Sequence, residues 1–590
     1  MTSEQIILFS LLGAVFALLL WGKIRHDLVA FGALVAAILI GAVPEERAFD
    51  GFAHPATVII ALVLVVSRGL SNSGAVELLA RHVVARGRSL FAHIGVMSGV
   101  AAVLSALMNN VAALALLMPI DIKAASQARR HPGLSLMPLS FASILGGLIT
   151  LIGTPPNIII AGFREEALGA PFSMFDFTPV GAVAALAGIA YIATLGWRLI
   201  PAAGKGAPGD LFNLEGYTAE VRVGEKSKAI GKKITELEDP AEAADVAIIG
   251  LVRGGRRFPG HVRREVVKKG DFLVIEAAAD NIDAFVGEFG LEYDLKKKKD
   301  GAPIGEDLSM FEVTVPHGAR IEGRSALDLR LRATQGVTML GVARQGRVER
   351  RRVRKLKIRA GDVLLLLGPT ERIAHVGAWI GGLALQERDL RVVKRDKARL
   401  AAGAFAIAIA AAASGAVSLT VALALVCVVM VAANIVPPRD IYNSIEWPVI
   451  VLLGSMIPLG AALQSSGGTA LIAQALLGLA EGYGAVVVLL VLMAVTMTLS
   501  DILNNAATTV IAAPVALDIA AGLGLNPDPF LMAVAVAASC AFLTPIGHKN
   551  NTLIMGPGGY RFGDYWRMGL PLEIIILAVA IPMILWVWPL

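Results

Sequence analysis

Cysteine is almost missing from this chain of 590 residues, which has two, Cys427 and Cys540, both inside apolar helical sequence. Neither a disulfide framework nor a cysteine metal site is expected from such a pair. Histidine, cysteine and aspartate nowhere show the spacing of a metal centre or a nucleophilic triad, which argues against an enzyme, and no organic cofactor is expected. A Thr-Val-Gly-Tyr-Gly filter and a Gly-x-Gly-x-x-Gly fingerprint are also absent, so the sequence indicates neither a selective channel nor a nucleotide-binding domain.

Charge is scarce and unevenly distributed. Hydrophobic residues make up 56% of the chain and charged residues 17%. Apolar segments long enough to cross a lipid bilayer recur over residues 5–200 and about 400–590, whereas residues 203–398 hold most of the charge. The formal net charge is +6, but its basic residues gather at loop ends and in the polar middle. This pattern predicts a polytopic membrane protein, and it does not indicate nucleic-acid binding.

Two long apolar runs are each interrupted by a pair of adjacent asparagines, Asn109-Asn110 and Asn504-Asn505. In both runs a serine precedes the first Asn by four residues and a proline follows the second by nine; these are Ser105 and Pro119, and Ser500 and Pro514. A buried amide without a partner costs about 2–7 kcal/mol. Paired amides at membrane depth therefore predict a polar ligand or a water-lined cavity.

The first and last parts of the chain repeat one another. Three further features recur in the same order: Val43-Pro44 and Val436-Pro437, Pro55 and Pro448, Ser73-Gly74 and Ser466-Gly467. Loops of the first part are basic, whereas no Lys or Arg occurs between Arg439 and Lys549. Equivalent loops then face opposite sides of the membrane, which predicts inverted repeats over 1–202 and 399–590 with five spans each. Both termini are expected outside.

Re-entrant hairpins and broken helices complete the predicted α-helical fold. Basic residues flank 90–120 on both sides, so we expect a hairpin with its tip near 108–111. The motif Gly153-Thr-Pro-Pro-Asn157 predicts an unwound break, because a proline inside a helix costs about 3 kcal/mol. Its counterpart is the segment 544–551. Such backbone occurs at this depth only where it is buried in protein or lines a cavity.

The polar middle part is itself a repeat. Runs such as Glu220-Val-Arg-Val and Gly270-Asp-Phe-Leu-Val-Ile recur as Glu312-Val-Thr-Val and Gly361-Asp-Val-Leu-Leu-Leu. They predict two small β-rich (α+β) cytoplasmic domains, 206–294 and 303–388. The lysine run at 295–300 is interpreted as a linker, with attraction to anionic lipid as the alternative.

The polar groups of the two apolar parts suit ion binding. Positive helix ends favour an anion, and oxygens of serine and asparagine suit a hard cation such as Na⁺. Asn suits both, since its oxygen accepts and its NH₂ donates. Asp501, beside Ser500, is a candidate for strengthening a cation site or carrying a proton. His548 and Lys549 follow the second break, where they could pair with an anion or act as an inner gate, or Lys549 could reach toward the cytoplasmic surface.

These residues resemble the divalent anion–sodium symporter family of the ion transporter superfamily, in which two hairpins with Ser-Asn-Thr tips pack against broken helices. The ending Gly556-Pro-Gly-Gly-Tyr resembles the branch of citrate-transporter-like proteins with two inserted TrkA C-terminal (RCK-C) modules, to which 206–294 and 303–388 are similar. The resemblance implies one Na⁺ site at Ser105, Asn109, Asn110 and Gly153, and a second at Ser500, Asn504, Asn505, Thr544 and Pro545. It places the anion between the tips, with these candidate ligands: Asn109, Asn110, Thr154, Asn157, Asn504, Asn505, Thr544 and Asn551.

The chain departs from that family at the tips. Asn109 and Asn504 stand where the family has Ser, and Val111 and Ala506 where it has Thr. The lost hydroxyls favour a compact oxyanion over a long dicarboxylate. The resemblance also implies a homodimer in the inner (plasma) membrane, with an unknown regulatory ligand for the cytoplasmic domains.

The leading functional hypothesis is Na⁺-coupled uptake of a divalent oxyanion such as sulfate, by alternating access. The alternatives are a dicarboxylate or citrate symporter, and a Na⁺/H⁺ antiporter or arsenite-type carrier that uses Asp501. An ion channel gated by the cytoplasmic domains ranks below them.

Overall fold

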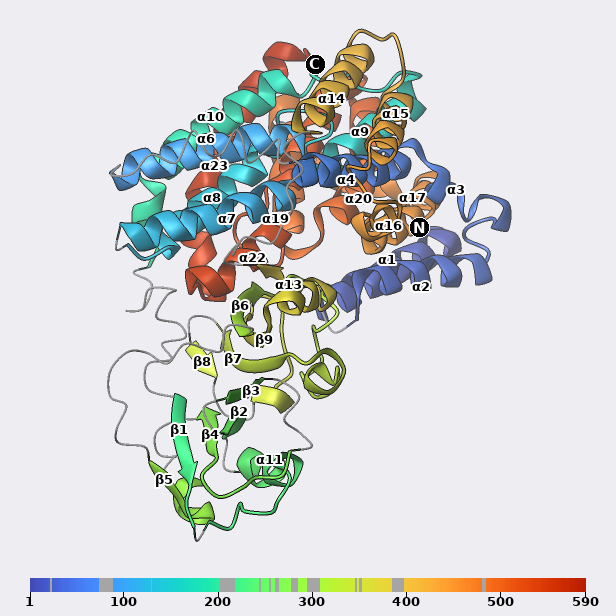
Figure 1. Ribbon diagram of the computed structural model, residues 1–590. Helices are drawn as coiled ribbons and strands as arrows, with labels where there is room; N and C mark the ends of the chain where they lie inside the picture. The colour runs from blue at the N-terminus through green and yellow to red at the C-terminus, as the bar shows by residue number, and fades with distance from the viewer. Residues whose placement is uncertain are drawn as a thin grey trace. The chain divides into compact units, whose positions relative to one another are not determined.

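The structure is a computed structural model of all 590 residues. It describes the whole chain except residues 22–23, 74–88, 129, 202–217, 226, 244–245, 254–255, 260–264, 277–284, 294–307, 345–346, 350–352, 385–396 and 480–483. The chain divides into two units (Figure 1). The membrane unit comprises 1–203, 391–554 and 561–590, and the β-rich unit comprises 204–390 and 555–560.

The first half of the membrane unit contains nine described α-helices. They are α1 (Ser3–Trp21), α2 (His26–Leu39), α3 (Asp50–Ala53), α4 (Pro55–Ser73), α6 (Leu90–Leu107), α7 (Asn110–Gln127), α8 (Gly133–Gly147), α9 (Pro155–Leu168) and α10 (Thr178–Thr194). Helices α6 and α7 are in contact, and the chain turns between them at 108–109, where the tip of the predicted hairpin is expected. The basic residues that precede the hairpin, Arg81, Arg86 and Arg88, lie outside the described residues.

The second half follows the same order. Its helices are α14 (Ala398–Ala413), α15 (Leu419–Ala432), α16 (Pro438–Ser444), α17 (Trp447–Ser465), α18 (Gly468–Leu479), α19 (Ala485–Ile502), α20 (Asn505–Leu523), α21 (Pro527–Ser539), α22 (Lys549–Gly558) and α23 (Tyr565–Val587). Here α19 and α20 form the hairpin, while α21 and α22 flank the break. Six helical segments among the described residues are long and apolar enough to cross a membrane, and shorter apolar helices accompany them.

The two halves pack together. Helix α4 contacts α14 and α15, α17 contacts α2 and α3, and α10 contacts α23 (Figure 1). Helix α9 of the first half lies against both α20 and α21 of the second. Elements that carry the polar motifs of different halves are thereby brought into one region.

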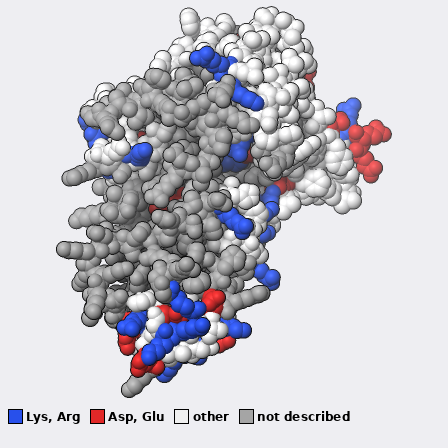
Figure 2. Space-filling view, viewed as in Figure 1, with Lys and Arg blue, Asp and Glu red and all other residues white. Residues whose placement is uncertain are grey.

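Apolar side chains cover much of the outside of the membrane unit. On α15 the exposed fractions of Val421, Leu425 and Val428 are 56%, 62% and 64%, and their spacing places them on one helix face. Figure 2 shows few charged side chains over the described surface of this unit in that view. Such a surface suits contact with lipid chains. The protein is therefore a mainly helical membrane protein.

The β-rich unit holds two small antiparallel sheets. The first contains β1 (Thr218–Val223), β2 (Ala247–Arg253), β3 (Arg256–Pro259), β4 (Phe272–Glu276) and β5 (Leu291–Tyr293), in the order β3-β2-β4-β1-β5. The second contains β6 (Leu308–Thr314), β7 (Thr338–Arg344), β8 (Arg347–Glu349), β9 (Val363–Pro369) and β10 (Leu383–Ala384), in the equivalent order β8-β7-β9-β6-β10. Helices α11 (Ile234–Ala243) and α13 (Thr370–Trp379) accompany them.

An equivalent buried Arg–Asp pair occurs in each of the two sheets. Arg253 donates two hydrogen bonds of 2.8 Å to Asp271, and Arg344 donates bonds of 2.8 and 2.7 Å to Asp362. Both aspartates are 1% exposed, so each carboxylate needs its paired guanidinium. The repeat read from the sequence therefore extends to side-chain contacts. The predicted lysine linker at 295–300 lies outside the described residues.

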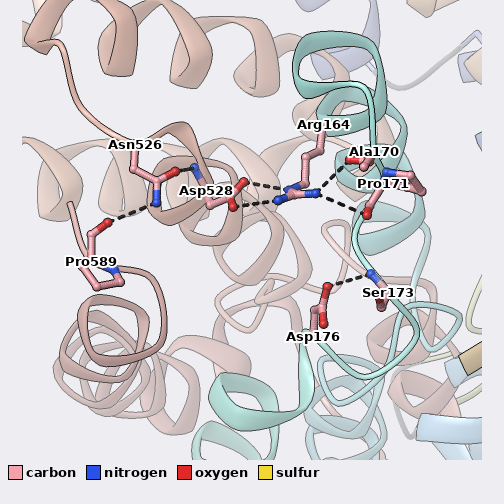
Figure 3. Close-up of polar contacts among 8 residues, drawn as sticks. All are labelled: Arg164, Ala170, Pro171, Ser173, Asp176, Asn526, Asp528 and Pro589. Atoms are coloured by element: carbon pink, nitrogen blue, oxygen red, sulfur yellow. Dashed lines mark hydrogen bonds and ion pairs between the residues drawn. The ribbon is translucent and has the colours of Figure 1, made fainter. Parts of the chain in front are cut away.

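An ion pair joins the two broken helices of the membrane unit (Figure 3). On α9, Arg164 donates from Nε and Nη2 to both carboxylate oxygens of Asp528 on α21, at 2.8 and 2.9 Å. Its Nη1 donates to the carbonyl oxygens of Ala170 and Pro171 at 2.8 and 3.3 Å. Asn526 accepts from the Asp528 amide at 3.0 Å and donates to the Pro589 carbonyl. This cluster fixes one end of α9 to one end of α21.

Candidate functional site

Each asparagine pair lies where a hairpin turns. The chain is extended at Met108 (φ −148°, ψ 170°) and at Leu503 (φ −105°, ψ 178°) between the two arms. The first Asn then caps the second arm, because Asn109 Oδ1 accepts from the Val111 amide at 2.8 Å and Asn504 Oδ1 accepts from the Ala506 amide at 2.9 Å. Asparagine is among the favoured residues at this helix position.

The second Asn of each pair contacts the serine that lies five residues before it in the chain. Ser105 Oγ donates to Asn110 Oδ1 at 2.6 Å, and Ser500 Oγ lies 3.0 Å from Asn505 Oδ1. Both serines are fully buried. Two oxygen atoms therefore lie side by side at the base of each tip.

The helix breaks repeat one another bond for bond. Asn157 Nδ2 donates to the carbonyls of Gly147 and Thr150 at 3.3 and 2.9 Å. Asn551 Nδ2 donates to those of Ala541 and Thr544 at 3.0 and 3.1 Å. These amides replace the partners that the unwound backbone loses, as buried carbonyls require.

A threonine ties each break to the adjacent hairpin. Thr150 Oγ1 donates to the Ala106 carbonyl and Thr544 Oγ1 to the Asp501 carbonyl, both at 2.5 Å. Thr150 is thus the counterpart of Thr544. Since Asn157 matches Asn551, His548 corresponds to Thr154.

The break itself lies slightly before its predicted position. Helix α8 ends at Gly147, and Pro155 and Pro156 form the first turn of α9. Proline is tolerated there because the first amides of a helix have no intrahelical partner. The prolines therefore start the new helix, while the unwound residues are 148–154.

The tips and the breaks line one cavity. Its wall contains all four paired asparagines, both breaks, and residues of α4 and of the α17 region: Ile60, Leu64, Asn109, Asn110, Val111, Gly153, Thr154, Pro155, Glu446, Val449, Asn504, Asn505, Ala506, Gly547, His548 and Lys549. Both asparagine pairs and parts of both breaks thus line the same cavity.

Four helices begin at this cavity. Their first residues, Asn110 (α7), Pro155 (α9), Asn505 (α20) and Lys549 (α22), all line it. Each helix start contributes about half a positive charge and unpaired amide donors. The field inside the cavity therefore favours an anion.

The second break also bonds to the first half. His548 Nε2 lies 3.4 Å from Asn110 Nδ2, and Asn550 Nδ2 donates to the Asn110 carbonyl at 3.2 Å. Ser143 accepts from Asn550 at 2.6 Å, while Ser140 donates to Asn551 Oδ1 at 2.9 Å. The first hairpin tip and the second break are therefore packed as one polar cluster.

Asp501 lies behind the second break and not on the cavity wall. It is 2% exposed, and its Oδ1 accepts from the Leu543 amide at 2.8 Å. The carboxyl group of Glu573 on α23 is also buried and accepts from the adjacent Phe542 amide at 3.4 Å, so the two acids bind neighbouring amides of the same segment. Glu573 is not among the predicted site residues; its signal in the sequence is a lone carboxylate inside the apolar run 565–587.

Lys549 is paired with Glu446, the residue before α17. Both side chains line the cavity. Glu446 is not among the predicted site residues either, because a single acid beside a helix start forms no recognisable sequence pattern.

The other predicted site residues support the cavity from behind. Ser105 and Ser500 hold the second asparagines, Asn157 and Asn551 hold the break carbonyls, and Thr544 holds the hairpin. Pro545 is buried, and its carbonyl accepts from Thr552 at 2.5 Å. None of these side chains is among those that line the described cavity.

Comparison with known proteins agrees with this architecture. A family model described as citrate transporter matches residues 16–524 and 479–590. The chain belongs to the citrate transporter family. The uncharacterized transporter sll0640 of Synechocystis is 32% identical over 564 residues, which cover 93% of this chain and 92% of that protein. The uncharacterized transporter YfbS of Escherichia coli is 30% identical over 631 residues, which cover 100% of both.

A more distant relative is named for its ions. The probable sodium/sulfate cotransporter 3 of Chlamydomonas reinhardtii is 27% identical over 346 residues, or 54% of this chain and 38% of that protein. Family membership confirms that this chain is a multi-pass membrane transporter and not an enzyme. The predicted citrate-transporter-like character is also confirmed.

Proposed function

We propose that this transporter couples Na⁺ to the uptake of a divalent oxyanion such as sulfate. The observation that carries the proposal is the meeting of four helix starts and Lys549 at one cavity lined by four asparagines. Amide donors and positive helix ends suit an oxyanion. The name of the Chlamydomonas relative supports sulfate as the first anion to test.

Sodium is the proposed coupling ion. Adjacent oxygens are available at Ser105 and Asn110, 2.6 Å apart, and at Ser500 and Asn505, 3.0 Å apart. Hard cations bind several oxygens at once, and a serine hydroxyl can turn its hydrogen away to serve as a ligand. Buried Asn157 Oδ1 and Asn550 Oδ1 have no hydrogen-bond partner among the described residues, and they leave two further oxygens near the breaks.

Alternating access is the proposed mechanism. The two halves act as inverted repeats of five spans, with re-entrant hairpins and both termini outside. Hairpins and broken helices move as one body against the remaining helices, in an inner-membrane homodimer. The bonds between the first tip and the second break support movement of these parts together.

The β-rich unit is proposed to consist of two cytoplasmic RCK-C-like domains that regulate transport by binding an unidentified ligand. The equivalent strand orders of its two sheets support a duplicated module.

Uptake of radiolabelled sulfate into proteoliposomes tests the function. An inward Na⁺ gradient should stimulate uptake, and thiosulfate should compete more strongly than succinate or citrate. The proposal is contradicted if neither the Na⁺ gradient nor competing dianions change the rate of sulfate uptake. Stronger competition by succinate or citrate would instead support the dicarboxylate symporter.

The burial of Asp501 and Glu573 beside the adjacent Leu543 and Phe542 amides favours a second candidate, a cation/proton antiporter or arsenite-type carrier. Two carboxyl groups buried together at this depth are candidates for carrying a proton. Asp501→Asn should abolish exchange if this candidate is correct, whereas it should only weaken cation affinity in the symporter.

A further inference from the structure

The cavity wall contains a lysine together with the carboxylate that neutralises it. Lys549, the first residue of α22, forms an ion pair with Glu446, and both side chains line the cavity. The two side chains are 30% and 34% exposed, so the pair faces the space where an anion would enter. The neighbouring His548 is engaged elsewhere, with Asn110 and with the Asn550 amide.

This ion pair is not part of the repeated framework. Because Asn157 corresponds to Asn551, the position of Lys549 is occupied in the first half by Pro155. The symmetric elements supply neutral amides and helix starts, which any small anion can use. The Lys–Glu pair adds one full positive charge that is already neutralised.

We propose that the Glu446 carboxylate pairs with the Lys549 ammonium group until substrate binds. Competition between this carboxylate and the substrate then makes the cavity select dianions over monoanions. The inference rests on the proposed function and names how its site recognises charge. A monovalent anion that displaces Glu446 exchanges one negative charge for another. A divalent anion brings a second charge to the same ammonium group and helix starts, so displacement favours it.

The pair is suited to displacement because it is partly exposed. Partly hydrated ion pairs contribute little net stability, so the lysine can change partners at small cost. Displacement also releases the charged contact between α17 and α22. Helix α17 packs on α2 and α3, whereas α22 follows the break, so anion binding would loosen a contact between two different parts of the membrane unit.

The test uses the purified full-length chain and isothermal titration at constant ionic strength and Na⁺ concentration. Two matched probe pairs of similar shape but different charge are compared, sulfate with perchlorate and succinate with monomethyl succinate. The wild type should bind the better dianion about tenfold or more tightly than its monovalent partner. Glu446→Gln should strengthen monoanion binding by about 3- to 10-fold and reduce that ratio. Lys549→Gln should weaken dianion binding by about tenfold or more.

Two further variants make each outcome interpretable. Glu166→Gln removes an exposed carboxylate that contacts His54 and does not line the cavity, so its binding constants should equal those of the wild type. If Lys549→Gln does not fold, the double variant Glu446→Gln/Lys549→Gln, which removes both charges, should show the same weak dianion binding.

The inference is overturned if the wild type binds a dianion but Glu446→Gln leaves the selectivity unchanged. It is also overturned if loss of Lys549 leaves the dianion affinity unchanged. Either result leaves the proposed function intact. A wild type that binds none of the four anions refutes both.

Discussion

The link between α9 and α21 gives a prediction about stability. Arg164 and Asp528 form a two-pronged ion pair whose side chains are 22% and 11% exposed. Arg164 also donates to two carbonyls, and its guanidinium carbon lies 4.7 Å from the Phe172 ring centroid. Replacing Arg164 with Ala leaves the largely buried Asp528 carboxylate without its cation.

The size of the loss follows from the burial of the pair. Breaking a fully buried pair costs about 3–5 kcal/mol, whereas an exposed pair contributes about 0–1 kcal/mol. For side chains that retain a little solvent contact we expect about 3 kcal/mol for Arg164→Ala and about 2 kcal/mol for Asp528→Ala. The double variant should lose only about 3 kcal/mol, which gives a coupling energy of about 2 kcal/mol.

The assay is SDS-induced unfolding of the full-length protein in mixed micelles, followed by tryptophan fluorescence. Trp588 is a local reporter, because its ring lies 6.0 Å from that of Phe172. Glu166→Ala is the matched control; Glu166 lies on the same helix as Arg164, its side chain is 60% exposed and contacts His54, so its loss should cost less than about 1 kcal/mol. Strictly additive losses at Arg164 and Asp528, or losses no larger than the control, would refute the reasoning.

Three other predictions concern the break, the exchange candidate and the β-rich unit. Gly153→Ala should abolish uptake while the protein still inserts, because the added Cβ would lie 2.5 Å from the Gly147 carbonyl oxygen; normal uptake by this variant contradicts the described break. Asp501→Asn should keep sulfate uptake and raise the Na⁺ concentration for half-maximal rate about threefold or more; complete loss favours the exchange carrier. Burial raises the pKa of Glu312, so the protonated side chain contributes to folding stability below the unfolded-state pKa. That contribution is lost as pH rises through the folded-state pKa. Glu312→Gln should therefore slow hydrogen exchange of β6 and β9 at pH 8 but not at pH 4, and equal effects at both pH values contradict this assignment.

The hairpins and breaks could be predicted because their residues violate helix rules locally. Paired asparagines within an apolar run, and glycine near proline, each indicate that a helix is interrupted. Both features occur twice in the chain, in the same order. The tips at Asn109 and Asn504 therefore lie where the sequence indicated.

Assignments that depend on tertiary packing could not be predicted. The sequence predicts a break at the two prolines, although they begin α9, because it does not show to which carbonyls Asn157 donates. Glu446 and Glu573 are single acids without a periodic pattern. Their roles depend on Lys549 and Asp501, which lie 103 and 72 residues away along the chain.

The repeat was more informative than any single motif. It identified the two halves of the site before their contacts were known, because equivalent polar residues must each find a partner at membrane depth. The departures from the repeat, at Lys549 and Asp501, are the positions at which the two halves of the site differ in charge.

Equilibrium binding of sulfate to the purified full-length protein, with and without Na⁺, tests the central claim most directly. The wild type should bind sulfate at least about tenfold more tightly in Na⁺ than in an equal concentration of choline. Asn110→Ala and Asn505→Ala should each weaken that binding by about tenfold, because each removes an amide from the same cavity. Sulfate binding that is unchanged by Na⁺ and by both substitutions would contradict the account.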